Sequence, residues 1–245
     1  MGSVRNSLQQ ARIDLAAVLR WAARLGYQVG VCNHFSLMVP DRDDLFLVNP
    51  EGLFWSEITA SSLIVCDLDG HIVEGEGTVE QTAFCLHAPI HRAHKGATAV
   101  LHTHSPYSTA LCLLQGGRLE PSEIGGLQFY GRIAYDEDFT GAALTTAEGD
   151  RVAALMGEKS IIMLRNHGPM VTAPGIAAAF DRLYYLEEAA KRQVIAMSTG
   201  QALSIVPAPI GQAMAANVPV QDAYAEKHLA AIKRVLDREC PDYAH

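Results

Sequence analysis

Histidines gather in one short stretch of this sequence, where they could bind a metal. Five of the ten lie between positions 87 and 104. His102 and His104 alternate in an apolar segment, residues 99–104, that is typical of a strand, so both imidazoles should leave the same face. Two neutral imidazoles side by side suit a borderline metal such as zinc, manganese or iron. The alternative is a pair of polar histidines at a strand end that binds no metal.

Further histidines flank this pair. His87 and His91 are four residues apart on a predicted helix and share a face, where they are ligands, supporting groups or ordinary packing residues. His167 follows an apolar strand at 161–164 and precedes Gly168, so it stands on a turn that could supply a third ligand. Three histidines leave a coordination position open for water or substrate, as catalytic metal sites usually do. Such a metal would polarise a substrate oxygen and stabilise the charge that develops as a carbon–carbon bond breaks.

The composition favours a cytoplasmic protein with a sizeable core. Of 245 residues, 49% are hydrophobic and 19% charged, which argues against a disordered protein. No apolar stretch is long enough to span a bilayer, and residues 1–14 lack the apolar region of a signal peptide. The net charge of −8 argues against nucleic acid and anionic membrane as partners, because phosphate binding needs a concentrated basic surface. Five cysteines without a CxxC pair agree with a reducing compartment.

Hydrophobic spacing and turn residues predict a mixed α/β protein. Helices are predicted at 8–25, 79–96, 146–156, 175–198 and 222–239, and a further short one after Ser105-Pro106. Strands are predicted at 34–39, 45–48, 63–67, 99–104 and 160–164, with Asp69-Gly70 as a hairpin turn. This order indicates a sandwich around a largely antiparallel sheet. We assign residues 1–205 to one domain, and residues 206–245 to a C-terminal tail and helix packed on that domain or on a neighbouring subunit.

Several short motifs, in this order, resemble the class II aldolase/adducin family. They are His-Phe-Ser at 34–36, Asn-Pro-Glu-Gly at 49–52, Ala-Val-Leu-His-Thr-His-Ser at 99–105 and Asn-His-Gly at 166–168. The resemblance covers about residues 8–200. It implies a three-layer α/β/α sandwich, and homotetramers of fourfold symmetry with active sites between neighbouring subunits. It also implies that His102, His104 and His167 bind one divalent metal per chain, with zinc as the first expectation and manganese or iron as alternatives.

The sequence departs from the sugar-phosphate aldolases that it resembles. Those enzymes carry a catalytic glutamate four residues before the helix histidine, and the matching residue here is Ala83, which cannot transfer a proton. Glu80 lies about one turn earlier and is a candidate replacement, as is His87. The Glu51 carboxylate would repel a phosphate dianion unless it were protonated or paired. The alternative is that Glu51 merely completes a turn and points outward. The positions that match the phosphate-binding residues are His34, Glu51-Gly52 and Gln81-Thr82.

Other motifs are closer to the bacterial adducin-like branch of this family. They are Asp-Leu-Asp-Gly at 67–70, Thr-Ala-Phe at 82–84 and Tyr-Gly-Arg-Ile-Ala at 130–134. That branch includes metal-dependent decarboxylases and non-haem-iron oxygenases of aromatic acids, and it is related to adducin head domains without a metal site. By resemblance, Tyr130 and, in the C-terminal tail, Tyr243 are candidate substrate contacts and proton donors. Arg132 and His34 are candidates for binding a substrate carboxylate.

We therefore expect a divalent-metal lyase that decarboxylates or cleaves, by retro-aldol reaction, a small oxygenated and non-phosphorylated substrate. Decarboxylation needs no glutamate base, which agrees with Ala83. Three alternatives stay open: a sugar-phosphate class II aldolase, a non-haem iron(II) oxygenase of an aromatic acid, and an adducin-like scaffold without catalysis. The retention of all three histidines argues against the scaffold.

Overall fold

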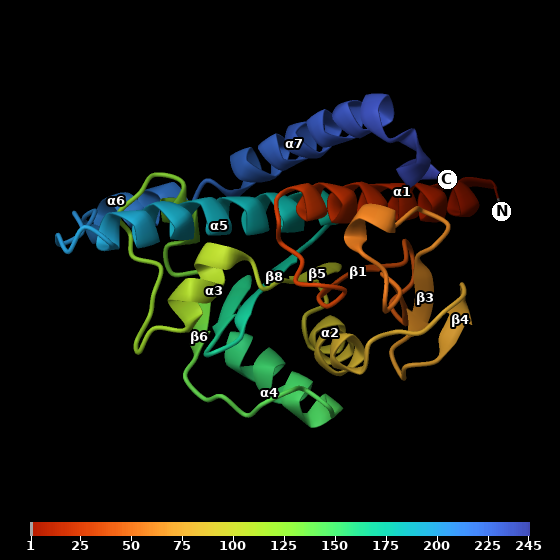
Figure 1. Cartoon of the computed structure of the whole chain (residues 1–245), viewed down its shortest axis with the longest axis horizontal. Coiled ribbons are helices and arrows are strands. Elements are labelled where there is room, and N and C mark those ends of the chain that lie inside the picture. The colour runs from red at the N-terminus through yellow and green to blue at the C-terminus, as the bar shows by residue number, and fades with distance from the viewer. Residues whose placement is uncertain (1) are drawn as a thin grey trace.

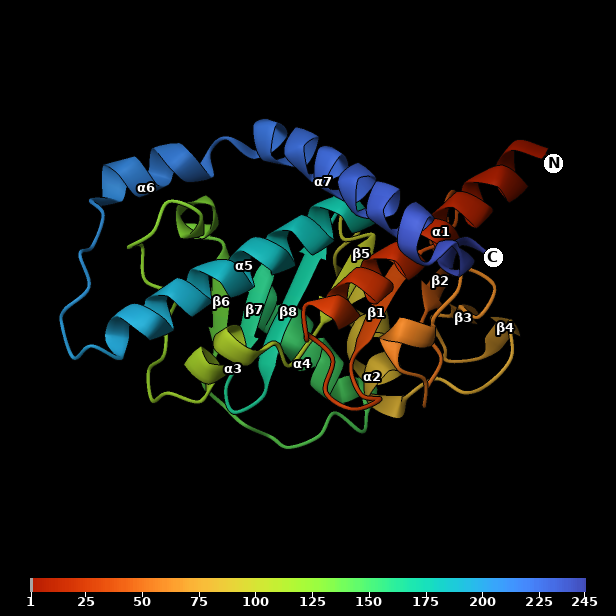
Figure 2. The ribbon, with the colours of Figure 1, turned by 45° about the horizontal axis from the view of Figure 1, so that its top comes forward.

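The computed structural model describes residues 2–245, with side chains described at 6–217 and 220–245. Within this range, eight strands form one sheet between layers of helices (Figure 1), in the order β4-β3-β2-β1-β5-β8-β7-β6, which can be followed in Figure 2. β6 and β7 run parallel and the other neighbouring strands are antiparallel, which confirms a mixed, largely antiparallel sheet. The strands are β1 (His34–Met38), β2 (Leu45–Val48), β3 (Ile64–Asp67), β4 (Ile72–Glu74), β5 (Ala99–His102), β6 (Ile133–Asp136), β7 (Ile161–Leu164) and β8 (Gly168–Ala173).

Helices cover both faces of the sheet, as Figure 2 shows. On one face lie α1 (Gly2–Arg24) and α5 (Ile176–Met197), with α7 (Val218–Glu239) packed outside them. On the other face lie α2 (Gln81–Ala93) and α4 (Thr146–Met156). The expected three-layer α/β/α sandwich is confirmed.

Strand residues alternate between the two helical layers. Leu101 packs in the core beneath α1 and α5, whereas Val100 packs beneath α2 and α4. Ser36 pairs with Val100 across β1 and β5, and His34 pairs with His102, so these polar residues belong to the face that α2 covers. The polar residues of the sheet therefore meet the histidine-bearing helix.

A close crossing of α2 and α4 sets the position of that helix. Pro89 lies inside α2 and has no N–H, so the carbonyl of Cys85, four residues earlier, has no partner within the helix. Gly149 of α4 approaches this carbonyl so closely that a Cβ atom there would lie 2.0 Å from its oxygen. The absence of a side chain at Gly149 is therefore what lets the two helices meet.

Most predicted elements agree with the structure to within a few residues. α4 has the predicted bounds, and α3 (Pro106–Cys112) begins at the predicted proline. The sequence does not predict β6, β8 or α6 (Ala208–Ala215), because glycine and proline near these segments favour turns. Among residues 2–245, no helix has the length and apolarity required to cross a membrane.

Substitution of Gly149 should destabilise the protein. A methyl group in Gly149→Ala would press on the Cys85 carbonyl and force α4 away from α2, at a cost of about 1–3 kcal/mol for overpacking. Urea unfolding would measure this loss. Gly96→Ala is the control, since nothing lies within 4 Å of a Cβ atom at that position. Equal stability of the two variants would contradict the prediction.

Candidate metal centre

Three histidines from separate parts of the chain meet at one end of the sheet. His102 ends β5, His104 follows by two residues, and His167 lies in the turn between β7 and β8. Because β5 pairs with β8 at His102 and Met170, that turn lies beside the end of β5. The ring centroids are 4.6, 4.9 and 5.0 Å apart. One nitrogen of each ring lies within 4.8 Å of the others, so the structure brings the three expected ligands together.

The Asn-His-Gly turn depends on its residue types to approach β5. Asn166 has a φ of 54°, in the left-handed region that asparagine tolerates better than most residues. Gly168 lies so close to the end of β5 that a Cβ atom there would be 2.5 Å from the Thr103 carbonyl oxygen. The motif therefore lets the turn fold against β5 and brings His167 beside His104.

The hydrogen bonding of His102 suits a metal ligand. Its Nδ1 lies 3.0 Å from the Pro169 carbonyl oxygen, which can only accept, so Nδ1 carries the ring proton and Nε2 is bare. That Nε2 is 3.2 Å from Nε2 of His104. Two imidazole nitrogens bound tetrahedrally to zinc, at about 2.0–2.1 Å each, would be about 3.4 Å apart. A carbonyl that orients a ligating ring is common at metal sites, so these residues fit a divalent ion.

Burial keeps the three rings neutral. It lowers the pKa of His104 and places that of His102 well below its usual value. Burial also lowers the pKa of His167 to about 4, although the nearby Glu148 carboxylate acts in the opposite direction. Neutral imidazole is the form that binds metals, so the cluster is in its ligating form at neutral pH.

A chain of hydrogen bonds leads from this cluster into the layer beneath α2. His34 is the cross-strand partner of His102, and their ring centroids are 5.1 Å apart. Nδ1 of His34 lies 2.8 Å from Nε2 of His87, whose Nδ1 lies 2.6 Å from Oγ of Ser36. The same hydroxyl is 2.8 Å from Nε2 of His91. His34 thus lies beside the cluster, and His87 is connected to it through His34.

Glu80 is connected to the cluster through two other side chains. Its Oε1 accepts a 2.6 Å hydrogen bond from the Thr82 hydroxyl, whose oxygen is 3.4 Å from Nε2 of His34. Ala83 is buried on α2 and has no polar side-chain atom to offer. A carboxylate therefore stands near the site, separated from the three histidines by Thr82 and His34.

The predicted phosphate-binding positions at 51–52 and 81 have their own partners. Glu51 accepts a 3.0 Å hydrogen bond from the Thr78 hydroxyl on an exposed turn, which Gly52 continues with a φ of 84°. Gln81 donates to the carbonyl oxygen of Leu144. The Glu51 carboxylate is thus exposed and hydrogen bonded to a neighbouring loop.

Three further predicted residues face other parts of their own chain. Tyr130 packs against α6 and Arg132 contacts α7. Both precede β6, which runs parallel to β7, so they lie at the end of the sheet opposite His167. Tyr243 is 1% exposed, and its hydroxyl donates to Asp237.

An ion-pair cluster beside His167 is absent from the sequence-based prediction. Arg151 of α4 pairs with Glu148 and with Asp136, a buried residue at the end of β6. Hydrogen bonds to Glu148 and Asp136 raise the pKa of Arg151. Glu148 in the first turn of a predicted helix is the available signal, but Asp136, the other carboxylate that pairs with Arg151, comes from a strand that the sequence does not predict.

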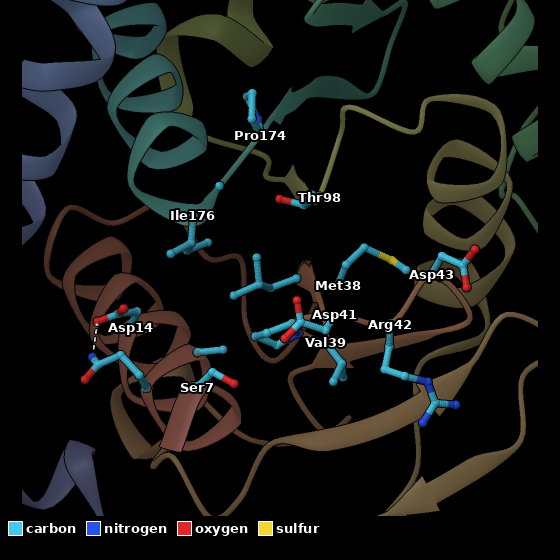
Figure 3. Close-up of a pocket in the computed structure, with 15 residues that line it drawn as sticks. Ser7, Asp14, Met38, Val39, Asp41, Arg42, Asp43, Thr98, Pro174 and Ile176 are labelled. Atoms are coloured by element: carbon cyan, nitrogen blue, oxygen red, sulfur yellow. Dashed lines mark hydrogen bonds between the residues drawn. The ribbon is translucent and has the colours of Figure 1, made fainter. Parts of the chain in front are cut away.

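A hollow of about 660 Å³ opens at the opposite end of the sheet (Figure 3). It lies between α1, the turn at 39–43 and the start of α5, and Met38 and Thr98 line it. These two residues lie at the ends of β1 and β5 away from His34 and His102. The hollow is therefore separate from the histidine cluster.

Known proteins are similar to this chain over nearly its whole length. Residues 13–194 match the family described as the Class II Aldolase and Adducin N-terminal domain. The crystal structure of an aldolase II superfamily protein from Pseudomonas syringae is 34% identical, with a TM-score of 0.90 over 98% of this chain and 96% of its own. Decarboxylase NovR of Streptomyces niveus is 31% identical over 91% of this chain and 84% of its own. L-fuculose 1-phosphate aldolase from Glaciozyma antarctica PI12 shares the fold, at a TM-score of 0.88 and 24% identity over 99% of this chain and 95% of its own.

A methyl group on Gly168 should weaken metal binding. In Gly168→Ala the added Cβ atom would push the turn from the Thr103 carbonyl and displace His167, so we expect zinc affinity to fall about tenfold or more. Competition with a chromophoric chelator measures this affinity. Gly175→Ala is the control, because its extended backbone and open surroundings accept a methyl group. Unchanged affinity in Gly168→Ala would contradict the assignment of His167.

Acidification should destabilise the metal-free protein in part through His91. Burial lowers the pKa of His91 to about 4, whereas an unfolded chain titrates near 6.5. Below about pH 6.5 the unfolded state gains a proton that the folded state does not, so the free energy of unfolding falls until about pH 4. Between about pH 6.5 and pH 4, this histidine lowers the free energy of unfolding by about 3 kcal/mol.

Urea unfolding in chelator at pH 7 and pH 5 would measure this loss. His91→Gln keeps the other buried histidines, and so the difference between the two proteins isolates His91. The variant should lose less stability than the natural protein between the two pH values. An equal loss would show that His91 is not the group responsible.

Proposed function

This chain belongs to the class II aldolase and adducin family, and from that premise we propose that it is a divalent-metal lyase. It would decarboxylate a small oxygenated, non-phosphorylated substrate or cleave it by a retro-aldol reaction. The observation that carries the proposal is the cluster of His102, His104 and His167, with a bare Nε2 on His102.

The three histidines would hold one divalent ion, with zinc as the first choice and manganese or iron as alternatives. When bound, the ion would supply a Lewis acid that polarises a substrate oxygen and offsets developing negative charge. The chain contributes rings whose orientation is set in advance by the strand pairing and by the Pro169 carbonyl. Such preorganisation is a general source of catalytic rate.

Two features favour decarboxylation over retro-aldol cleavage. Ala83 offers no acid or base, and the Glu80 carboxylate is already hydrogen bonded to Thr82. Loss of carbon dioxide needs no carboxylate base to begin the reaction, whereas retro-aldol cleavage must remove a hydroxyl proton. The similarity to a protein named as a decarboxylase supports the same choice.

The partners of Glu51 and Gln81 support a non-phosphorylated substrate. Thr78 and the Leu144 carbonyl engage these side chains, and a carboxylate at position 51 disfavours a phosphate dianion nearby.

A homotetramer in the cytoplasm, with active sites between subunits, is part of the proposal. Tyr130 and Arg132 lie at the far end of their own sheet, more than one strand length from His167. A strand of four residues spans about 13 Å. These side chains would therefore serve the cluster of a neighbouring copy. Tyr243 would contact substrate only after breaking its hydrogen bond to Asp237.

Elemental analysis of tag-free protein tests the metal. We expect about one divalent ion per chain in the natural protein and almost none in the double variant His102→Ala/His104→Ala, because two of three ligands are lost. Circular dichroism would show that the variant keeps its fold. Absence of metal from the natural protein, even after incubation with zinc, manganese and iron(II), would instead support an adducin-like scaffold.

The reaction is tested with the metal-loaded protein under anaerobic conditions. Carbon dioxide released from small hydroxy or keto acids, aliphatic and aromatic, is the expected result, and the double variant should release none. Turnover that requires oxygen would establish an oxygenase in its place. Turnover confined to fuculose or ribulose phosphates would establish a sugar-phosphate aldolase and overturn the proposed substrate class.

A further inference from the structure

One direction of the buried hydrogen-bond chain beneath α2 keeps all of its contacts of 3.0 Å or shorter. It begins at the Ala97 carbonyl oxygen, which can only accept and lies 3.0 Å from Nδ1 of His91. Nδ1 of a neutral His91 therefore carries the proton, and its Nε2 must accept from the Ser36 hydroxyl. Ser36 has one proton, which goes to Nε2 of His91 at 2.8 Å and not to the Val100 carbonyl oxygen at 3.5 Å, so its oxygen accepts from Nδ1 of His87. Nε2 of His87 is then bare and accepts from Nδ1 of His34.

The surroundings of the three rings keep them neutral, as this direction of the chain requires. His34, His87 and His91 are at most 3% exposed, and no carboxylate forms an ion pair with them among the described residues. Burial without a counter-charge disfavours a charged imidazole, and it lowers the pKa of His91, which lies farthest along the chain from the metal centre, to about 4. One proton per ring is thus the state at neutral pH.

The far end of the chain is an acceptor with no committed donor. Once Nδ1 of His34 donates to His87, Nε2 of His34 is bare. The nearest hydroxyl, that of Thr82, is 3.4 Å away, and its single proton goes to the Glu80 carboxylate at 2.6 Å. A proton on Nε2 of His34 could reach only this 3.4 Å contact and would break one of the 2.6–2.8 Å hydrogen bonds of the chain, so the bare Nε2 is favoured. A chain that only filled the core would end on a satisfied atom, since buried polar groups are almost always paired. Here it ends beside His102, at the candidate metal centre.

We propose that Ser36, His87 and His91 are positioning residues that hold His34 in the tautomer with a bare Nε2, and that His34 accepts a hydrogen bond from a substrate hydroxyl beside the three-histidine cluster. The substrate class is therefore a hydroxylated one, such as a hydroxy acid whose hydroxyl meets His34. A carboxylate or phosphate oxygen is excluded from this position because two lone pairs would face each other. The substrate contact rests on the proposed function, whereas the tautomers do not.

The tautomer with a bare Nε2 does not suit His34 to bind a substrate carboxylate. A neutral ring with a bare Nε2 has no proton to give to a substrate carboxylate, the role considered for it from the sequence. The hydroxyl preference follows from the Ala97 carbonyl, which lies 63 positions away along the chain and acts through three intervening side chains.

The tautomers are tested by two-bond ¹H–¹⁵N correlation spectra of metal-free, ¹⁵N-histidine-labelled protein at pH 7. In the natural protein His34, His87 and His91 should each carry their proton on Nδ1. In Ser36→Ala, His87 loses its acceptor, so protonation of Nε2 should appear at His87 and His34, while the Ala97 carbonyl keeps His91 unchanged. Neither metal nor turnover is needed, so a failed proposed function leaves this measurement intact.

Matched variants distinguish an effect of the hydrogen-bond direction on the His34 tautomer from an effect of altered packing. His91→Gln can still donate to Ala97 and accept from Ser36, so it should keep the His34 tautomer, whereas His91→Leu should lose it. Ser160→Ala removes a buried hydroxyl for which the described residues offer no partner and should change nothing. A proton on Nε2 of His34 in the natural protein, or an unchanged His34 in folded Ser36→Ala and His91→Leu, would overturn the proposal.

The hydroxyl preference is tested with glycolate and acetate, which differ by one hydroxyl group. Their affinities for the cobalt(II)-loaded protein can be measured by visible absorption. The preference for glycolate should fall about fivefold to tenfold in Ser36→Ala, the size of one hydrogen bond, and should persist in Ser160→Ala. An equal preference in Ser36→Ala and the natural protein would refute the hydroxyl contact even if the tautomers are as expected.

Discussion

The antiparallel pairing of β5 with β1 on one side and β8 on the other is the constraint on which the site depends. This register places His34 opposite His102 and Met170 beside His102, which brings the turn of His167 to the same sheet end. Side chains alternate along a strand, so a shift of one residue would carry the histidine of β5 to the other helical layer. The apolar residues that precede His102 in β5 therefore maintain the register as well as the core.

Two hydrogen-bond systems end at the same place. His102 is oriented by the Pro169 carbonyl, and His34 is oriented, through three side chains, by the Ala97 carbonyl. In both cases a main-chain acceptor determines that Nδ1 carries the proton, so Nε2 is left bare. The His34 and His102 rings lie next to each other. Main-chain carbonyls move little and never donate, so they are dependable anchors for a neutral imidazole. The site thus presents acceptors and ligands, with no side-chain cation among its central residues.

The electrostatic character of the site separates it from a carboxylate-based one. Ala83 offers no acid. Of the carboxylates near the cluster, Glu80 is hydrogen bonded to Thr82 and Glu148 is paired with Arg151. Proteins that share this fold carry names as different as decarboxylase and sugar-phosphate aldolase. Fold alone therefore does not choose the reaction, and the residues around the three histidines must do so. A cluster without a contacting carboxylate is suited to steps in which no strong base is needed.

The sequence by itself determined the features that depend on neighbouring residues. The His-Thr-His spacing and the Asn-His-Gly turn, taken together with the family resemblance, indicate the three histidines that cluster, and local periodicity locates α4 and α5, because these signals are complete within a few residues. Only the tertiary structure decided that His87 meets His34 and Ser36, that Asp136 pairs with Arg151, and that Tyr130 lies at the far end of its own sheet. Those relations join segments 15 or more residues apart in the sequence, through packing of helices and strands that no local pattern reveals. The direction of the histidine chain is of the same kind, since a single carbonyl at its remote end decides which nitrogen faces the site.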